Sequence, residues 1–235
     1  MTPKIFKRSD GRKNDEMRQI SAKVGVVESA DGSAMWQQGD TIAVAVVRGP
    51  RKMHPQHQQD PTTGKLRCTY SMASFSVTER IRPGMSRRAT EISKIIEWAL
   101  SPVLMLENFP NMVVDVYVTI TQADAGTRCA GINAAALALA HAGIPMRNIV
   151  SSVALGKLDK TIVVDLTKDE EDYKEGEGST DIPITITPKG EITHIQLDGK
   201  ITGEELKQAI ELAKKASKEI YEIQKKALKE IGGEK

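Results

Sequence analysis

This chain of 235 residues is poor in the features that mark several classes of protein. It has two cysteines, Cys68 and Cys129, and no CxxC spacing, so we expect a reducing cytoplasm and two buried apolar thiols rather than metal ligands or nucleophiles. Aromatic residues make up only 4%, as in a soluble globular protein with few rings. Residues 1–15 contain no apolar leader segment, and no apolar run approaches the length of a membrane span, so we expect a cytoplasmic protein with no membrane partner.

The chain also lacks a strong charge of one sign. Its net charge of +2 is nearly neutral, so nucleic-acid binding would require a local basic patch or a basic partner subunit. Hydrophobic residues make up 40% of the chain, which is long enough for one large core or two small ones. Because no linker divides the sequence convincingly, we expect residues 1–235 to form a single domain.

Hydrophobic periodicity predicts a mixed α/β fold. Residues 50–64 are rich in proline and indicate a loop, and residues 1–19 form a basic arm that is either solvated or packed on a partner. Helical spacing predicts helices from Ser86 to Leu100, over 130–142 and over 202–231, the last with an apolar stripe for a core or an interface. Alternating or β-branched segments predict strands over 21–28, 41–47, 66–75, 113–120, 150–155, 161–166, 181–187 and 191–197.

The most informative stretch is Gln122-Ala-Asp-Ala-Gly-Thr-Arg128, between a β-branched strand and an alanine-rich helix. A strand that turns directly into a helix presents free backbone N–H groups and the positive end of the helix dipole at one point. Arg128 adds a planar fork of donors that matches phosphate oxygens. The sequence therefore predicts a bound phosphate, either free or within a nucleotide.

An acidic segment follows the strand at 161–166. A run of carboxylates is usually only a solvated loop. Asp181 is different, because it stands directly before an apolar strand, where a free carboxylate is unexpected unless it has a role. Carboxylates at the end of one strand and the start of the next can converge on Mg²⁺, which prefers hard oxygen ligands, water and phosphate. The acidic residues are Asp169, Glu170, Glu171, Asp172, Glu175, Glu177 and Asp181.

Basic residues cluster before the first predicted helix. Arg87 and Arg88 fall in its first turn, where cations oppose the helix dipole, and a phosphate near that turn would resolve the conflict. The alternative is a pair of exposed, solubilising arginines. His54, in the proline-rich loop, has no visible set of metal-ligand partners. Tyr70 could stack on a base, but its place in an alternating strand favours partial burial.

In combination, these residues resemble the RNase PH family, and within it the catalytic ring subunit of the archaeal exosome. The similarity covers nearly the whole chain. Two stretches, Met53-His-Pro55 and Ala142-Gly-Ile-Pro-Met-Arg147, favour the exosome branch over the bacterial tRNA-trimming enzyme. The stretches that carry the similarity are Asp10-Gly-Arg12 with Glu16-Met-Arg18, Ala30-Asp-Gly-Ser-Ala34, Val47-Arg-Gly-Pro50, Ser86-Arg-Arg88, Glu91-Ile-Ser-Lys94, Gln122-Ala-Asp-Ala-Gly126, Met53-His-Pro55 and Ala142-Gly-Ile-Pro-Met-Arg147.

The resemblance implies phosphorolysis of RNA from its 3′ end. Inorganic phosphate is the co-substrate, the products are nucleoside 5′-diphosphates, and the reverse reaction extends RNA. The task of such a protein is to orient phosphate and neutralise crowded charge. The resemblance assigns phosphate binding to Gly126, Thr127, Arg128 and Arg88, and RNA binding to Arg87, Arg88, Arg67 and His54. A second basic residue of the family is replaced here by Thr69.

The acidic segment departs from the family pattern. Asp181 matches the second family aspartate in Asp181-Ile-Pro183, and Asp172 is the most natural match to the first, but the connection between them is longer than the pattern. A loop absorbs such an insertion at small entropic cost. We therefore predict Asp181 and Asp172 as the catalytic and Mg²⁺-binding pair, with Glu171 or Glu175 as substitutes for Asp172.

The resemblance also implies a fold and partners. The fold is the RNase PH fold of two βαβ-type halves, with mixed sheets packed against helices as in domain 2 of ribosomal protein S5. The expected assembly is a hexameric ring in which this subunit alternates with a related inactive subunit, as a trimer of heterodimers, capped by RNA-binding proteins and threaded by the 3′ end of single-stranded RNA. Two alternatives are a homohexameric tRNA-trimming enzyme and, less favoured, a non-catalytic RNA-binding ring subunit.

Overall fold

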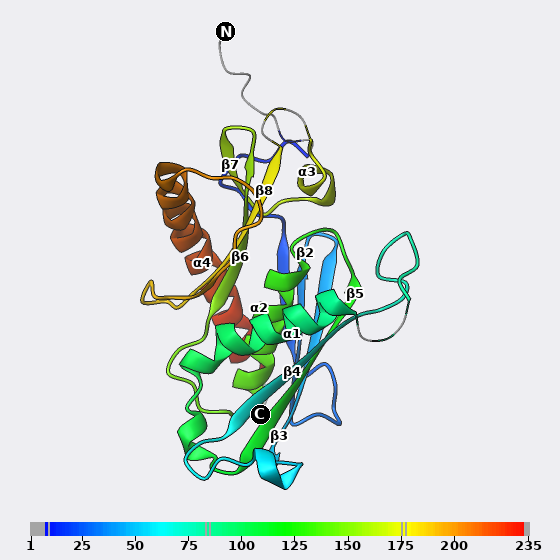
Figure 1. The fold of residues 1–235 in the computed structure, drawn as a ribbon, viewed down its shortest axis with the longest axis vertical. Coiled ribbons are helices and arrows are strands. Elements are labelled where there is room, and N and C mark those ends of the chain that lie inside the picture. Colours follow the sequence, from blue (N-terminus) through cyan, green and yellow to red (C-terminus); the bar gives the residue numbers. More distant parts are fainter. Residues whose placement is uncertain are drawn as a thin grey trace.

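The computed structural model describes residues 8, 10–82, 84, 86–174, 176 and 178–232, and its first half is built on a five-stranded sheet (Figure 1). The strand order is β1-β2-β3-β5-β4, and β4 and β5 are parallel, joined through helix α1 at Arg87–Leu100 in a βαβ unit. The strands span Ile20–Val24 (β1), Gly32–Gln38 (β2), Thr41–Lys52 (β3), Lys65–Met72 (β4) and Met112–Gln122 (β5).

The second half contributes a four-stranded antiparallel sheet in the order β7-β6-β8-β9. The expected mixed α/β fold is confirmed, although a parallel βαβ unit is formed only in the first half of the described chain. The remaining elements span Ser151–Leu158 (β6), Thr161–Val164 (β7), Lys168–Glu171 (the short helix α3), Ser179–Ile186 (β8) and Ile192–Ile195 (β9), with 3₁₀ turns at Gln56–Gln58, Ser101–Val103 and Leu106–Asn108.

Helix α2, at Thr127–His141, lies at the centre of the molecule and contacts strands of both sheets. It is buried from Cys129 to Leu139, as expected of a helix that is apolar on all sides. A Cβ atom on Gly32 of β2 would lie 2.4 Å from the Ala138 carbonyl oxygen, so only glycine permits this close approach of strand and helix. On the other side, the Asn133 amide exchanges two hydrogen bonds, of 2.8 and 2.9 Å, with the Ser152 backbone of β6.

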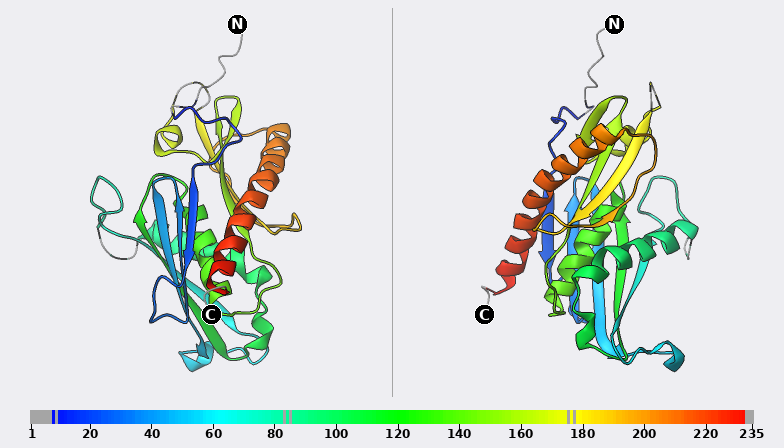
Figure 2. Two further views of the ribbon diagram at one scale, coloured as in Figure 1. Left: turned by 180° about the vertical axis from the view of Figure 1, so that it is seen from behind. Right: turned by 60° about the vertical axis from the view of Figure 1, so that its left-hand side comes forward.

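The C-terminal helix α4, at Gly203–Gly232, runs along one side of the molecule against β6 and β1 (Figure 2). The predicted apolar stripe faces inward, with Ala213, Ala216 and Ile220 buried. Both cysteines are free and buried as predicted, and burial raises the pKa of the Cys129 thiol to about 12. Among the helices of the described residues, none combines the length and apolar character needed to cross a membrane.

Strand β2 was not predicted from the sequence pattern, and neither was the short helix α3. The sequence of β2, Gly32-Ser-Ala-Met-Trp-Gln-Gln38, contains no β-branched residue, and it is a strand because it pairs with β1 on one side and β3 on the other. Helix α2 also begins at Thr127 rather than at residue 130.

The basic N-terminal segment differs at Arg8 from the solvated arm that is one interpretation of residues 1–19. Residues 1–7 and 9 lie outside the described part of the chain. Arg8 is only 3% exposed and makes two hydrogen bonds, of 2.8 and 2.9 Å, to the Glu170 carboxylate on α3. Its guanidinium also donates to the Val164 and Asp165 carbonyl oxygens at 2.8 and 2.7 Å. Arg8 is therefore packed within its own chain, whereas residues 10, 11, 13, 15, 16 and 19 of the same segment are exposed.

Candidate active site

The turn between β5 and α2 has the geometry of an anion-binding site. Ala125 and Gly126 adopt left-handed backbone angles, with φ of 55° and 63°, and α2 begins at the next residue. Within the described residues, no side chain caps the start of α2, so the N–H groups of its first turn remain free. Thr41 on β3 fixes the turn, because its hydroxyl donates to the Ala125 carbonyl oxygen at 2.7 Å and accepts from the Asp124 N–H at 3.0 Å.

One pocket brings together residues from distant parts of the sequence. It lies where the starts of α1 and α2 meet α3 and β8, so that helix dipoles, arginines and carboxylates share one space. All four predicted phosphate-binding residues line it. The polar residues that line the pocket include Tyr70, Arg88, Gly126, Thr127, Arg128, Lys168, Glu171, Asp181 and Asp198.

Arg128 and Asp181 face each other in this pocket, and within the described residues not all of their hydrogen-bonding atoms have partners. The Arg128 Nη1 atom lies 3.4 Å from Asp181 Oδ2, and the Arg128 Nε atom is buried with no hydrogen-bond partner in the described chain. Burial raises the pKa of Asp181, the negative charges of Glu171 and Asp198 raise it further, and Arg128 and Arg88 oppose this. The site therefore has room for an anion beside the arginines and for a cation beside the carboxylates.

The second carboxylate of the predicted pair is not where the sequence placed it. Asp172 is 63% exposed, pairs with Lys168 Nζ at 3.0 Å and does not line the pocket. Glu171, one residue earlier, does line it. The reason is the capping box of α3, in which Thr167 and Glu170 cap each other and turn Glu170 toward Arg8. This register directs Glu171 to the pocket, whereas Glu175 lies outside the described residues.

The carboxylates fit a magnesium ion better than a metal that needs many protein ligands. In the described ranges, no group of three or more histidine, cysteine, aspartate or glutamate side chains is placed to hold a metal. Mg²⁺ usually keeps several waters and takes only one or two protein carboxylates together with substrate phosphate oxygens. Asp181 with Glu171 meets that requirement, and a cation there would offset the repulsion that raises the pKa of Asp181.

The predicted RNA-binding residues are spread along the molecule. Arg88 lines the pocket, whereas the neighbouring Arg87 is exposed outside it. Arg67, on the outer face of β4, donates to Asp115 Oδ1 at 2.5 Å, and Arg51 pairs with the other oxygen of the same buried carboxylate. One carboxylate therefore holds two half-exposed arginines side by side, which leaves a net positive charge on this face.

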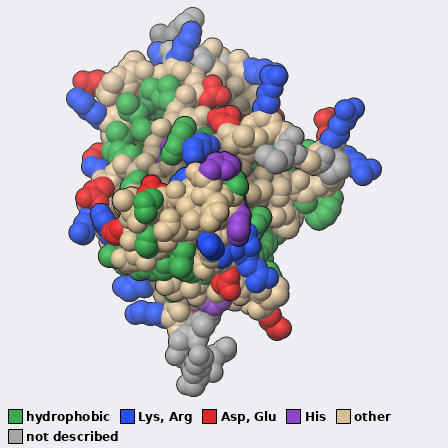
Figure 3. All heavy atoms as spheres, turned by 60° about the horizontal axis from the view of Figure 1, so that its bottom comes forward, with side chains coloured by type: hydrophobic (Ala, Val, Ile, Leu, Met, Phe, Trp, Pro, Cys, Tyr) green, Lys and Arg blue, Asp and Glu red, His purple; other side chains and the backbone are tan. Residues whose placement is uncertain are grey.

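His54 lies at the far end of the molecule from the pocket. Its neighbour Met53 pairs with Asn111 just before β5, and the pocket turn follows the other end of β5 at Gln122, so about 30 Å of strand separates them. Figure 3 views this end and shows histidine side chains beside lysine and arginine side chains. The structure therefore does not bring His54 to the candidate active site.

Sequence reasoning missed a buried ionic network behind the turn. Arg18 donates to both Asp165 oxygens, at 2.8 and 2.9 Å, and to the Asp124 carboxylate at 2.8 Å and its carbonyl oxygen at 2.6 Å. Burial alone would raise the pKa of Asp165, but the hydrogen bonds and charge of Arg18 hold it below its usual value. Arg18 thus ties the pocket turn to the end of β7. No local pattern signals this network, because Arg18 is more than a hundred residues from both aspartates.

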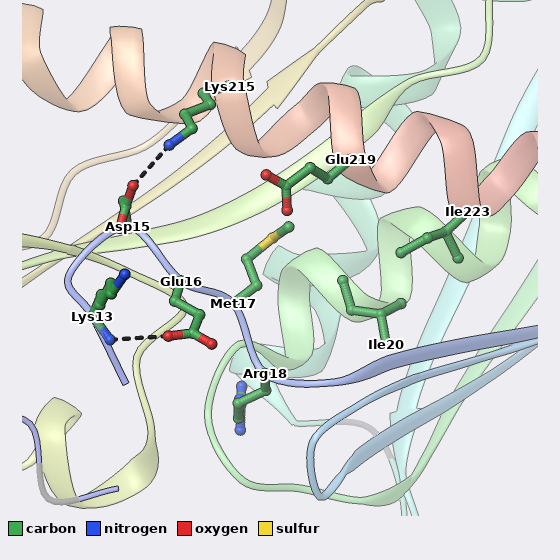
Figure 4. A pocket seen from close by; sticks show the side chains of 9 residues that line it. All are labelled: Lys13, Asp15, Glu16, Met17, Arg18, Ile20, Lys215, Glu219 and Ile223. Atoms are coloured by element: carbon green, nitrogen blue, oxygen red, sulfur yellow. Dashed lines mark hydrogen bonds and ion pairs between the residues drawn. The ribbon is translucent and has the colours of Figure 1, made fainter. Parts of the chain in front are cut away.

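A second hollow lies between the N-terminal segment and α4 (Figure 4). Two of its carboxylates are engaged, since Asp15 pairs with Lys215 at 2.7 Å and the Glu16 carboxylate accepts from the Lys13 N–H at 3.2 Å. Met17 contributes apolar surface. This hollow shares no lining residue with the first pocket, and its geometry suggests no chemistry.

Comparison with protein families matches both halves of the chain. Residues 16–145 match domain 1 of the 3′ exoribonuclease family RNase PH, and residues 148–216 match domain 2 of the same family. The chain is 52% identical over 225 residues to the exosome complex component Rrp41 of Thermococcus gammatolerans, covering 95% of this chain and 89% of that protein. It is 48% identical to the protein of the same name from Methanopyrus kandleri, over 96% of this chain and 93% of that protein.

Solved structures share the fold at lower sequence identity. Rice Rrp46 superimposes with a TM-score of 0.82 at 23% identity, over 93% of this chain and 98% of the rice chain. A chain of the Archaeoglobus fulgidus exosome with RNA bound to the active site gives a TM-score of 0.80 at 20% identity, over 92% of both chains. At these sequence identities, the similarity shows that this chain shares its arrangement of sheets and helices with the two solved structures.

Proposed function

Because the chain belongs to the RNase PH family of 3′ exoribonucleases, we propose that it is the catalytic subunit of an archaeal exosome and degrades RNA from the 3′ end with inorganic phosphate. One observation carries the proposal. The free N-terminus of α2, Arg88 and Arg128 share a pocket with Asp181, with 3.4 Å between Arg128 Nη1 and Asp181 Oδ2. That pocket can hold an anion and a reacting phosphodiester next to a carboxylate.

The proposed reaction is a transfer to phosphate and not a hydrolysis. A phosphate oxygen bonds to the phosphorus of the terminal phosphodiester, and the bond from that phosphorus to the preceding 3′ oxygen breaks. The 3′ oxygen gains the proton that monohydrogen phosphate gives up on becoming part of the diphosphate. The product is a nucleoside 5′-diphosphate. The N–H groups at the start of α2, the Thr127 hydroxyl and Arg128 would hold the attacking phosphate, and Arg88 would hold the terminal RNA phosphate.

Asp181 and Glu171 are the residues proposed to hold Mg²⁺, in place of the pair Asp181 and Asp172. The ion would stabilise negative charge that develops on the leaving oxygen. Asp181 is fixed for this task at the start of β8, where its backbone exchanges two hydrogen bonds of 2.9 Å with Asp198. Burial, together with the negative charges of Glu171 and Asp198, raises its pKa, and a cation bound there would favour the charged carboxylate.

The proposed assembly is a ring with a related inactive subunit, in the cytoplasm, capped by RNA-binding proteins. The proposal is supported by sequence identities of 52% and 48% to proteins named as exosome components. The nearly neutral net charge of +2 is also consistent with an RNA channel whose basic lining is shared between subunits.

The first experiment tests phosphate dependence. The full chain, with and without its ring partner, is incubated with 5′-labelled single-stranded RNA, Mg²⁺ and phosphate, and the released nucleotides are identified. We expect nucleoside diphosphates only when phosphate is present, and strong activity only with the partner. Activity of the chain alone as a homohexamer would favour the tRNA-trimming enzyme, and unchanged cleavage without phosphate would exclude phosphorolysis.

The carboxylate assignment is tested by a matched pair of variants. Glu171→Gln should lower kcat at least about a hundredfold because it removes a charge at the reacting phosphate, whereas Asp172→Asn should stay within about threefold of the wild type. Asp181→Asn should abolish cleavage while RNA binding survives. The opposite ranking, with Asp172→Asn inactive and Glu171→Gln active, would restore Asp172 to the site.

A further inference from the structure

Tyr70 lies beside the pocket and is held there from two sides. Along β4, Tyr70 faces the helices, and it is only 3% exposed. Its backbone N–H donates to Ser93 Oγ at 2.8 Å, and that hydroxyl donates to the Ala89 carbonyl oxygen at 2.7 Å. Helix α1, whose first turn carries Arg88, therefore fixes the position of Tyr70.

The Tyr70 ring packs on α2 at the point where that helix has no side chain. A Cβ atom on Gly131 would lie 3.8 Å from Tyr70 Cε2. Thr127 is one helical turn nearer the N-terminus on the same face, so the hydroxyl end of the ring can reach the first turn of α2. Tyr70 and Thr127 both line the pocket.

The Tyr70 hydroxyl oxygen is buried. The Thr127 side chain lies near enough to lower the pKa of Tyr70 by hydrogen bonding, but within the described residues the hydroxyl makes no hydrogen bond of normal length and angle. A buried polar group without a partner is destabilising, and a native protein usually supplies one. Burial raises the pKa of Tyr70, so the group stays protonated at neutral pH and is available as a donor. Its surroundings supply other donors, namely the N–H groups of α2 and the guanidinium groups of Arg88 and Arg128.

A partner that suits all these donors must have several acceptor oxygens and a negative charge. The buried Arg128 Nε atom, which is also without a partner in the described chain, points to the same conclusion. A phosphate ion accepts hydrogen bonds in several directions at once and carries the negative charge that suits two arginines, whereas a water molecule accepts at most two hydrogen bonds and carries no charge.

We propose that Tyr70 is a phosphate-binding residue, whose hydroxyl donates a hydrogen bond to an oxygen of the inorganic phosphate held at the N-terminus of α2. This rests on the proposed function, because it takes phosphate to be the co-substrate. It extends that function by adding a donor from β4 to those from α1 and α2, so that three elements of the fold surround one anion.

The test is Tyr70→Phe, which removes the oxygen and keeps the ring. In the assembled ring, we expect KM for phosphate to rise about tenfold, since hydrogen bonds to charged groups are among the stronger ones. The kcat at saturating phosphate and the affinity for RNA without phosphate should stay within about twofold. Inorganic phosphate should also raise the unfolding midpoint of the variant less than that of the wild type. Tyr221→Phe, the same change on α4 outside the pocket, is the matched control and should behave as the wild type.

Two results would overturn the proposal. One is a Tyr70→Phe variant with a lower unfolding midpoint in buffer but an unchanged KM and an unchanged phosphate-induced shift, which would make Tyr70 purely structural. The other is a wild-type protein that phosphate does not stabilise at all. If phosphate stabilises the wild type and Tyr70→Phe loses that effect, but no nucleoside diphosphate is released, the assignment of Tyr70 holds and the proposed function fails.

Discussion

Two groups of charged residues lie on opposite sides of the β5–α2 turn, and they differ in how completely their charges are paired. Behind the turn, the Asp165 carboxylate is 1% exposed and is bonded by Arg18 and Arg12. In front of it, Asp181 has one long contact of 3.4 Å to Arg128. The pKa of Asp165 is lowered and that of Asp181 is raised. Paired charges therefore fix the turn, and poorly paired charges remain for ligands.

This contrast explains why similar residue types have different roles only a few residues apart. Glu170 and Glu171 are neighbours in one short helix, yet Glu170 is 2% exposed and bonded to Arg8, whereas Glu171 lines the pocket. A carboxylate that already accepts two hydrogen bonds from a buried guanidinium has little capacity left for a metal ion. The following predictions test whether the two groups are as separate in function as they are in geometry.

The largest effect on stability is expected from Arg18→Met. The change removes the guanidinium from buried Asp165 and leaves it the backbone N–H of residue 18 at 2.8 Å and the longer contact to Arg12. Loss of one partner from a buried ion pair costs about 3–5 kcal/mol. Denaturant unfolding should show this loss, together with weaker phosphate binding as the turn relaxes. Lys215→Met, which breaks an exposed pair with Asp15, is the control and should change stability by less than about 1 kcal/mol. If the two changes lowered the unfolding free energy equally, the role of Arg18 in fixing the turn would be contradicted.

Arg128→Lys should mainly affect activity. Lysine keeps the charge but not the planar fork, so we expect kcat/KM for phosphorolysis to fall about a hundredfold while the unfolding free energy changes by less than about 1 kcal/mol. Steady-state kinetics over a phosphate series would measure the first quantity and denaturant unfolding the second. A variant that loses stability but keeps its activity would place Arg128 with the structural network instead.

Asp181→Asn should raise the unfolding midpoint slightly at pH 7 in the absence of Mg²⁺. A folded-state pKa above the unfolded value of 3.8 means that the wild type loses stability as pH rises through the folded pKa, and asparagine removes that loss. Asp165 has the opposite sign, because its contribution is present above pH 3.8 and is lost as pH falls through its lower folded pKa. Thermal unfolding across pH 3–8 would measure both; a lower midpoint for Asp181→Asn at every pH would contradict the assignment.

The smallest effect is expected from Thr127→Ser. The change keeps the hydroxyl at the start of α2, so KM for phosphate should stay within about threefold of the wild-type value. Thr127→Val keeps the shape and removes the hydroxyl, and we expect KM to rise about tenfold. If both variants bind phosphate equally well, the backbone N–H groups and arginines are sufficient and the hydroxyl has no part in binding.

Features that depend on neighbouring residues were predicted well from the sequence. The Ser86 hydroxyl accepts from the Ala89 N–H at 3.0 Å and caps the helix that was predicted to start there. A helix was also predicted to follow the turn at Gly126, although α2 begins at Thr127, three residues before the predicted start. Caps and turns of this kind are set by the backbone preferences of a few adjacent residues. Strand β2 could not be found in this way, because its partners supply the pairing that its own residues do not favour.

The sequence by itself determined where an anion can bind, since a strand, a glycine turn and a helix start with Arg128 follow one another in seven residues. Only the tertiary structure decided which carboxylate of the acidic segment lines the same pocket. The choice of Glu171 over Asp172 depends on the register of α3, and that register is fixed by Arg8 bonding Glu170 across 162 positions of the chain. It also decided that the Tyr70 hydroxyl lies beside Thr127. Contacts between residues so far apart arise from the packing of the whole core, and no pattern of neighbouring residues encodes them.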